Sequence, residues 1–459
     1  MSSSSQTISP KTSIVVKIFI IGLLSLALLV PTGMIWWMNS ERSSRNQEAI
    51  SEIMKTWAGE QSLAGPVIVI PYHQLESQDT YPNNSSTPVK QWVTRTYEAY
   101  FLPQELNVNG ELFPEIRYRG IFKVPVYTSH LEVKGKFKRP DFSKLGISEK
   151  EIEWDKAVIR IGVSELKGLR ETLSMQWNET SLTFGPGETG DSYFPRNVES
   201  PLKNLKDSTS SDFNFSLNLS LAGSQSFNFI PLGKQTQVNL RSNWTHPSFD
   251  GAYFPISRSI NEKGFEANWS VLEEGRQFPQ MFTSASNRYD LTQDRFGVKL
   301  MLPVDIYQLN TRSVKYANLF ILLSFTAFFL FEILSQLRIH PLQYLLVGLA
   351  LSVFYLLLLS LSEQIGFSLA YLTASTATVS LILFYLKSVL KKSSRLILMG
   401  GILSGLYAYL YALLQAEDYA LLLGSIGLFA ILALVMFITR KIDWYGMESH
   451  PHSTHPLLG

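Results

Sequence analysis

Apolar residues are unevenly distributed along the chain, with one run near the N-terminus and five runs after residue 316. A helix needs about 20 consecutive apolar residues to cross a bilayer. The pattern therefore predicts six membrane-spanning helices, at residues 18–37, 317–334, 342–361, 365–386, 396–414 and 420–438. The first run has full spanning length and lacks a small-x-small cleavage site, which favours a span over a cleaved signal peptide. Short connections predict that the last five helices, residues 317–438, form a compact antiparallel bundle.

The long segment between the first and second runs, residues 39–315, has the polarity of a soluble domain. It opens with apolar residues at helical spacing (Ile50, Ile53, Met54 and Trp57), which predicts an amphipathic helix at 39–57. After residue 65 the apolar positions alternate with polar ones, most clearly in the segments 131–137, 157–163, 213–221 and 265–271. Such alternation is typical of antiparallel strands with one buried and one solvated face. We therefore predict a polytopic α-helical membrane protein with a large β-rich, sandwich-like extracytoplasmic domain.

Charge in the connections predicts the orientation of the chain. Basic residues occupy every second connection: Lys11 and Lys17, then Arg338, then Lys387, Lys391, Lys392 and Arg395, and finally Arg440 and Lys441. The two other short connections carry Glu363, Glu417 and Asp418 and no basic residue. The positive-inside rule then places the N-terminal tail (1–17) and the C-terminal tail (439–459) in the cytoplasm, with the β-rich domain on the opposite side.

Composition excludes several classes of function. A formal net charge of +2 gives no basic field of the kind that binds nucleic acid. The absence of cysteine excludes disulfides, Cys-ligated metals and thiol catalysis. The chain has no HExxH or GxSxG motif, and the glycine-rich segment 185–190 lacks the Lys-Ser/Thr of a P-loop and is typical of a turn. His450, His452 and His455 lie in a short polar tail that is more typical of disorder than of a metal site. We expect no cofactor, no metal and no catalytic residue.

Ionisable residues near or inside the spans are candidates for a functional site. Glu332 lies in the second span, where a charged group is costly and therefore suggests a function. The alternative is a structural role, in which Glu332 reaches the interface or pairs with Arg338 or with His340 at the start of the next span. Both interpretations remain open from the sequence.

A second candidate group lies in the connections expected on the side of the β-rich domain. Glu363, Glu417 and Asp418 form a predicted carboxylate cluster that binds a cation or docks basic residues. Arg312 and Lys315 are the nearest basic candidates for such a coupling of domain and membrane. The alternative is a pair of solvated turns, with Glu417 and Asp418 stabilising the N-terminus of the last helix. Asp305, between Pro303 and Tyr307, is expected either to couple the domain to the second span or to cap a turn.

Several long runs of sequence resemble one known family. They are residues 302–308 (Leu-Pro-Val-Asp-Ile-Tyr-Gln), 340–351 (His-Pro-Leu-Gln-Tyr-Leu-Leu-Val-Gly-Leu-Ala-Leu), 439–445 (Thr-Arg-Lys-Ile-Asp-Trp-Tyr) and, in the polar domain, 118–127. Together they resemble the CreD family of bacterial inner-membrane proteins, also called the colicin-tolerance or cell envelope integrity family. The resemblance implies a Gram-negative inner-membrane location, a role in envelope integrity and association with a sensor-kinase regulon. It implies no settled biochemical activity.

Three classes of function fit this organisation. The first is a non-enzymatic envelope protein, anchored in the lipid bilayer, whose β domain binds an envelope protein, a lipid or a cell-wall component. The second is a small transporter or lipid-handling protein with Glu332 and the Glu363 group along a path through the bundle. The third is a membrane-embedded enzyme, for which the sequence offers no catalytic motif. We expect the first, with no nucleic acid among the partners.

Overall fold

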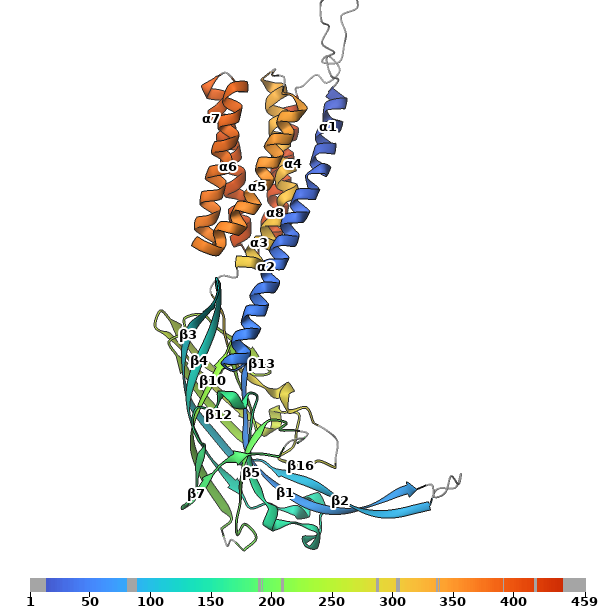
Figure 1. Ribbon diagram of the computed structural model, residues 1–459, viewed down its shortest axis with the longest axis vertical. Coiled ribbons are helices and arrows are strands. Elements are labelled where there is room, and N and C mark those ends of the chain that lie inside the picture. Colours follow the sequence, from blue (N-terminus) through green and yellow to red (C-terminus); the bar gives the residue numbers. More distant parts are fainter. Residues whose placement is uncertain are drawn as a thin grey trace, which may run out of the picture. The chain divides into compact units, whose positions relative to one another are not determined.

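The computed structural model describes residues 14–80, 89–188, 191, 193–207, 210–285, 289–302, 306–335, 337, 339–390, 392–416 and 419–440. The chain forms two compact units, which are drawn in Figure 1. The helical unit comprises Met1–Asn46 and Val304–Gly459, and the β domain comprises Gln47–Pro303.

The described part of the helical unit confirms the six predicted spans. It contains α1 (Ile14–Ala27), α2 (Leu29–Thr56), α3 (Ile306–Lys315), α4 (Ala317–Leu334), α5 (Pro341–Ile365), α6 (Phe367–Leu390), α7 (Ser393–Gln415) and α8 (Ala420–Thr439). Six helical stretches among the described residues are long and apolar enough to cross a membrane, counting α1 and α2 as one. The short helix α3 precedes the second span and buries the polar residues Asn310 and Ser313 together with Tyr307 and Val314.

The first span and the predicted amphipathic helix are continuous rather than separate. Only Leu28 interrupts the helix between α1 and α2, and Thr32 N still donates to Leu28 O at 3.3 Å. Pro31 has no backbone N–H to donate to residue 27, which accounts for the interruption of the helix at Leu28. Charged residues begin within α2 at Glu41, so the helix continues from the apolar span into a polar segment.

Aromatic side chains fill the centre of the helical unit. Phe320 of α4, Phe354 of α5, and Tyr371 and Tyr407 of α6 and α7 stack edge-on or tilted, with ring centroids 4.6 to 6.4 Å apart. The expected compact bundle does not include every helix equally. In α8, which the structure describes in full, no residue is buried, so its apolar surface is left for lipid or another chain.

The β domain contains two sheets. Among the described residues the first has the order β13 (Pro247–Gly251), β17 (Phe296–Leu300), β11 (Ser226–Ile230), β1 (Gln61–Thr80), β5 (Val158–Val163), β9 (Asn197–Pro201) and β8 (Gly185–Pro186). Also in this sheet, β2 (Val89–Phe101) pairs with β1, and β16 (Met281–Thr283) pairs with β2. The glycine-rich segment predicted as a turn thus begins with the short strand β8.

The second sheet has eight strands among the described residues. Their order is β14 (Ser257–Asn261), β15 (Gly264–Leu272), β12 (Gln235–Ser242), β3 (Glu105–Arg119), β4 (Phe122–Lys138), β10 (Asp212–Ser224), β6 (Ser174–Trp177) and β7 (Thr180–Thr183). The four segments predicted from alternation lie in β4, β5, β10 and β15. The apolar faces of both sheets contribute to one core, whose largest buried side chains include Trp269, Tyr127 and Phe227.

The alternation predicted antiparallel strands, and most pairs are antiparallel, but both sheets are mixed. Strand β1 pairs with β11 in parallel, and β12 pairs with β3 in parallel. Between β10 and β11 the chain passes from one sheet to the other within a single residue. That residue, Gln225, has a φ of 61°, and this left-handed conformation turns the chain at the corner. Alternation in the sequence predicts where each strand lies. It does not predict which strand pairs with it after a corner of this kind.

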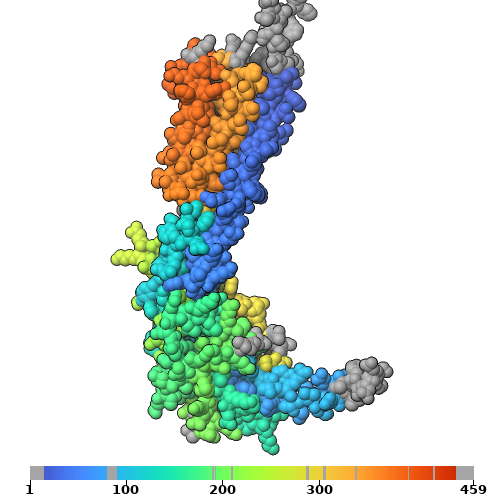
Figure 2. Space-filling model, viewed as in Figure 1, coloured from blue at the N-terminus to red at the C-terminus, as the bar shows by residue number. Residues whose placement is uncertain are grey.

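Strands β1 and β2 continue beyond the first sheet as a two-stranded arm. From Tyr72↔Tyr97 to Thr80↔Val89 the two strands pair with each other. Beyond Tyr72 no other described strand pairs with β1. Figure 2 shows the arm as a light-blue projection of the domain. Its side chains are largely solvated, including Leu75 and Trp92, which are 62% and 67% exposed.

Candidate functional site

Glu363 forms a polar cluster where α2, α3 and α5 meet in the helical unit. Its Oε2 accepts a hydrogen bond from Arg42 Nη2 at 2.6 Å, and its Oε1 accepts one from Tyr307 Oη at 3.0 Å. The Glu363 side chain is 4% exposed, whereas that of Arg42 is 37% exposed. A buried carboxylate with one charged and one neutral donor is compensated, so this geometry can hold helices together without a ligand.

Amides extend this cluster along α3. Asn310 donates to Ser362 Oγ at 2.8 Å, and Asn39 donates to Thr311 Oγ1 at 2.7 Å. Each bond joins α3 to a different helix, α5 in the first case and α2 in the second. Since buried polar groups need partners, these bonds fix α3 against both helices.

Glu332 forms a second cluster near the end of α4. It is paired with Lys17 of α1, and its two oxygens also accept hydrogen bonds from Ile339 N at 2.8 Å and Tyr344 Oη at 2.9 Å. The side chain of Glu332 is 5% exposed. Three donors surround one carboxylate, so the charge is satisfied where it lies.

The remaining sequence candidates fall into two groups. His340, considered as a partner of Glu332, instead caps α5, where its Nδ1 accepts from Leu342 N at 3.2 Å. Arg312 lies against the end of α7, with Nη2 3.5 Å from Ala416 O, and Lys315 is exposed. The others, Asp305, Glu417, Asp418 and Arg338, lie outside the described residues, so the predicted cluster of Glu363 with Glu417 and Asp418 has no geometry here.

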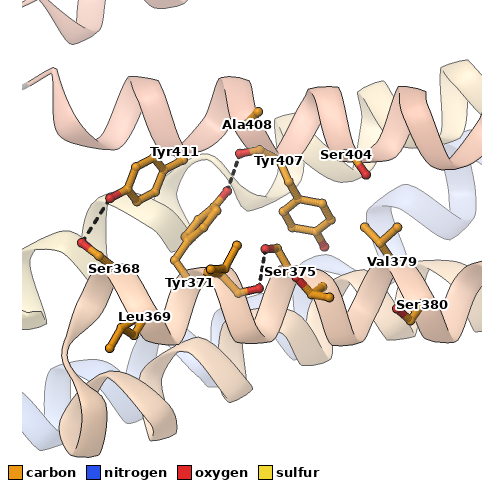
Figure 3. Close-up of a pocket in the computed structure, with 12 residues that line it drawn as sticks. Ser368, Leu369, Tyr371, Ser375, Val379, Ser380, Ser404, Tyr407, Ala408 and Tyr411 are labelled. Atoms are coloured by element: carbon orange, nitrogen blue, oxygen red, sulfur yellow. Dashed lines mark hydrogen bonds between the residues drawn. The ribbon is translucent and has the colours of Figure 1, made fainter.

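Sequence reasoning overlooked a hydroxyl-lined groove between α6 and α7 (Figure 3). The groove has a volume of about 610 Å³ and is walled by Ser, Thr, Tyr and aliphatic side chains. Tyr371 Oη donates to Tyr407 O at 2.7 Å, and Tyr411 Oη donates to Ser368 Oγ at 3.1 Å. The signal was present in the sequence as hydroxyl residues recurring every three or four positions in both helices.

The solvated face of the second sheet carries a polar groove of about 730 Å³. Two adjacent rows of paired residues cross β12, β3, β4 and β10 here: Asn239, Asn109, Glu132 and Asn218, and beside them Arg241, Glu111, His130 and Ser220. Arg241 pairs with Glu111 at 2.9 Å, and His130 Nδ1 lies 3.0 Å from Ser220 Oγ. The groove therefore presents amide, carboxylate, imidazole and guanidinium groups in a regular array.

A buried charge cluster connects strands of the first sheet. Arg160 of β5 pairs with Asp191, with Glu199 at 2.9 Å and with Glu98 at 3.2 Å. Burial alone lowers the pKa of Arg160, but the carboxylates of Glu98 and Asp191 outweigh it and the net pKa is raised. Tyr100 Oη also donates to Asp191, at 3.2 Å. Among the described residues no group of three or more His, Asp or Glu side chains has metal-binding geometry. The Arg160 cluster links β5 to β2, to β9 and to Asp191 through ion pairs.

These features define a multi-pass membrane protein with a large β domain and compensated charges in its helical unit. A family model described as "Inner membrane protein CreD" matches residues 13–445. The inner membrane protein CreD of Escherichia coli (strain K12) is 36% identical over 424 residues, which cover 92% of each chain. The chain belongs to the CreD family and is a multi-pass inner-membrane protein.

Solved structures give only weak likenesses. A mutant M1 zinc metallopeptidase from Deinococcus radiodurans bound to a Tyr-Ser-Ala substrate is 10% identical, with a TM-score of 0.17, over 37% of this chain and 39% of the other. A two-domain M1 zinc metallopeptidase mutant bound to L-arginine is 9% identical, with the same TM-score and coverage. The chain thus spans about two fifths of those peptidases' length. Likeness at this level carries no argument about function.

Proposed function

We propose that this protein is a non-enzymatic component of the cell envelope that contributes to envelope integrity. In this proposal the helical unit anchors it in the inner membrane, and the β domain, on the non-cytoplasmic side, binds a cell-wall component. The alternation of basic connections along the chain supports that orientation. An envelope protein or a lipid is the competing partner for the same domain.

The observation that carries the proposal is the polar groove on the second sheet. Its Asn109, Asn218 and Asn239 amides each both donate and accept hydrogen bonds, and Glu111 and Glu132 accept them. Hydroxyl groups also donate and accept, so a saccharide polymer of the wall matches this array better than an apolar or singly charged ligand. The row of pairs crosses four strands, which suits an extended polymer rather than a small molecule.

The compensated charges of the helical unit support an anchoring role for that unit. Glu332 and Glu363 are the carboxylates that a transport path would use, yet each is buried against donors of neighbouring helices. A path residue needs to exchange partners with its cargo, which costs several kcal/mol when the existing pair is buried. The pairs of Glu332 with Lys17 and of Glu363 with Arg42 instead support a role in attaching α1 and α2 to the bundle.

Wall binding is tested by co-sedimentation of the full-length protein, in mild detergent, with purified cell-wall sacculi. We expect the wild type to sediment with the sacculi and the double variant Asn109→Ala with Asn218→Ala to stay in solution. Asn214→Ala is the matched control, because Asn214 is an exposed asparagine of the same strand as Asn218 but lies outside the groove. Equal sedimentation of all three proteins contradicts the proposal. Photocrosslinking from position 109 then identifies a protein or lipid partner instead.

A second candidate function, lipid handling, is favoured by the groove between α6 and α7. Its hydroxyls lie in membrane-spanning helices, where they offer hydrogen bonds to a lipid headgroup, while Leu369 and Val379 contact a chain. Filling the groove by Ser375→Leu tests this role through labelling by a photoactivatable phospholipid. If the groove binds lipid, the phospholipid should label α6 and α7 in the wild type, and Ser375→Leu should abolish that labelling. Unchanged labelling removes this candidate.

A further inference from the structure

The tip of the β3–β4 hairpin extends beyond the second sheet. Strand β12 pairs with β3 only as far as Leu112, and β10 pairs with β4 only from Val126 onwards. Beyond these points β3 and β4 pair with each other up to Arg119↔Phe122. Gly120 turns the chain with a φ of 60°, a conformation that glycine adopts without strain.

One face of this hairpin is covered by the C-terminal part of α2. Ile53 of α2 packs against Val124 and Val126 of β4. Trp57 lies under the guanidinium group of Arg117, 3.9 Å from the ring centroid, and Arg119 Nε donates to Glu52 at 2.7 Å. From Arg117 to Arg119 the partner on α2 moves back from residue 57 to residue 52. The hairpin tip therefore points along α2 towards Gln47, the first residue of the β domain.

The other face of the tip is apolar and solvent-exposed. Ile116, Tyr118 and Ile121 are 40%, 63% and 40% exposed, although the domain has a large core in which such side chains are normally buried. They lie within six residues, at a turn, so they form one projecting apolar edge.

Basic side chains flank this edge. The segment 115–123 carries Arg117, Arg119 and Lys123 against Glu115 alone, and Lys55 of α2 lies beside them. A pocket of about 480 Å³ between α2 and the hairpin is lined by Lys55, Trp57, Arg117, Tyr118 and Arg119, together with Glu52, Ile53 and Thr56. The Arg119 side chain remains 64% exposed despite its pair with Glu52, and such exposed pairs are weak enough for a phosphate to compete.

Trp57 adds a further feature to the pocket. A second guanidinium, that of Arg170, lies 4.2 Å from its ring centroid, so the indole is held between two cations. Its buried Nε1 has no hydrogen-bond partner among the described residues. A donor left without a partner beside several cations suits an anionic oxygen ligand.

We propose that the β3–β4 hairpin tip is a membrane-surface site for anionic phospholipid. In this site Lys55, Arg117, Arg119 and Lys123 bind headgroup phosphates, while Ile116, Tyr118 and Ile121 enter the boundary of the acyl chains. Apolar side chains interleaved with basic ones bind anionic bilayers through burial and charge together. An acidic protein partner would match the basic side chains alone, whereas an anionic bilayer matches the basic and the exposed apolar side chains together. The site uses other residues than the polar groove, so either proposal survives failure of the other.

The absence of cysteine makes a single-site probe straightforward. The full-length variant Ile121→Cys, labelled with an environment-sensitive fluorophore, is reconstituted into bilayer discs of phosphatidylcholine alone or of an equal mixture with phosphatidylglycerol. We expect blue-shifted, brighter emission in the mixed discs and quenching by spin-labelled lipid. Gln78→Cys, on the exposed β1–β2 arm, is the control and should give water-like emission in both discs.

Charge dependence separates lipid binding from simple contact with the disc. Replacing Arg119 and Lys123 by Gln should lower the ratio of inserted to free tip about thirtyfold in the mixed discs. If labelling at 121 disturbs the turn, Tyr118→Cys reports on the same edge. Water-like emission at both positions in both discs overturns the proposal. So does a shift that appears with inorganic phosphate alone, which indicates an anion site, or only in native membranes, which indicates a protein partner.

Discussion

Lys17 of α1 and Glu332 of α4, 315 residues apart in the sequence, form an ion pair in the helical unit in which the carboxylate is buried and the lysine is partly buried. Tyr344 and the backbone of Ile339 complete the donor set around the carboxylate. The first span is thereby attached to the bundle by charge as well as by apolar packing. The pair accounts for an ionisable group that the apolar sequence around it would otherwise disfavour.

Removing either partner of this pair should destabilise the protein. Glu332→Gln leaves the Lys17 ammonium without its counter-charge, and Lys17→Met leaves the Glu332 carboxylate without its own. Each substitution is expected to lower the free energy of unfolding by about 3 kcal/mol or more. The double variant should recover part of that loss. The measurement is the unfolding of the purified full-length protein in mild detergent. Glu41→Gln, which breaks only the exposed pair with Arg45, is the control and should cost less than about 0.5 kcal/mol. Equal effects of the buried and exposed substitutions would contradict the structural role.

Arg160 should be the most sensitive charged residue of the β domain. Arg160→Met leaves Glu98, Asp191 and Glu199 without their shared cation and is expected to cost about 3 to 5 kcal/mol of stability. Arg160→Lys should recover little, because an ammonium group cannot reach several carboxylates as a planar guanidinium does. Circular dichroism of the full chain during heating measures the loss. Arg241→Met, which breaks an exposed pair, should shift the midpoint little, and a larger shift there than at Arg160 would refute this ranking.

The folded protein should lose stability at alkaline pH because of Tyr253. Burial, followed by the hydrogen bond to Asp294 at 3.0 Å, raises the pKa of Tyr253 to about 12. Because the folded state favours the neutral phenol, this contribution is fully present below about pH 10 and is lost as the pH rises towards about 12. Tyr253→Phe should be less stable than wild type near neutrality and should show a shallower decline across that interval.

The pH experiment compares unfolding midpoints of wild type and Tyr253→Phe. Tyr118→Phe removes a hydroxyl from an exposed position of the hairpin and serves as the matched control. Parallel curves for wild type and Tyr253→Phe between about pH 10 and about pH 12 would show that this hydrogen bond does not carry the alkaline transition.

The β1–β2 arm should contribute little to the stability of the β domain. Trp92→Ser and Leu75→Ser remove apolar side chains that are largely solvated, so each should change the free energy of unfolding by no more than about 0.5 kcal/mol. An isolated two-stranded ribbon is only marginally stable in water. We therefore expect the arm, residues 73–80 and 89–96, to exchange amide hydrogens faster than the core strands. Slow exchange there in the isolated protein would contradict its solvated state.

Much of the fold follows from local patterns. The runs of apolar residues predicted six spans, and alternation predicted β4, β5, β10 and β15, because both patterns depend on neighbours in the sequence. The helix at 39–57 was also expected, but its continuity with the first span, interrupted only at Leu28, was not. The exposure of α8 was likewise not predictable, because apolar residues that face lipid and apolar residues that face protein look alike in a sequence.

The candidate residues divide along the same line. The sequence by itself determined that the chain is a membrane protein with a β-rich domain, that it lacks thiol chemistry, and that Glu332 and Glu363 lie in or beside the spans. Only the tertiary structure decided which partners they have: Lys17 for the first, and Arg42 with Tyr307 for the second. The same holds for the polar groove, the corner at Gln225 and the hairpin tip. The physical reason is that burial and pairing are properties of surfaces brought together across hundreds of residues, and no periodicity in the sequence records which surfaces meet.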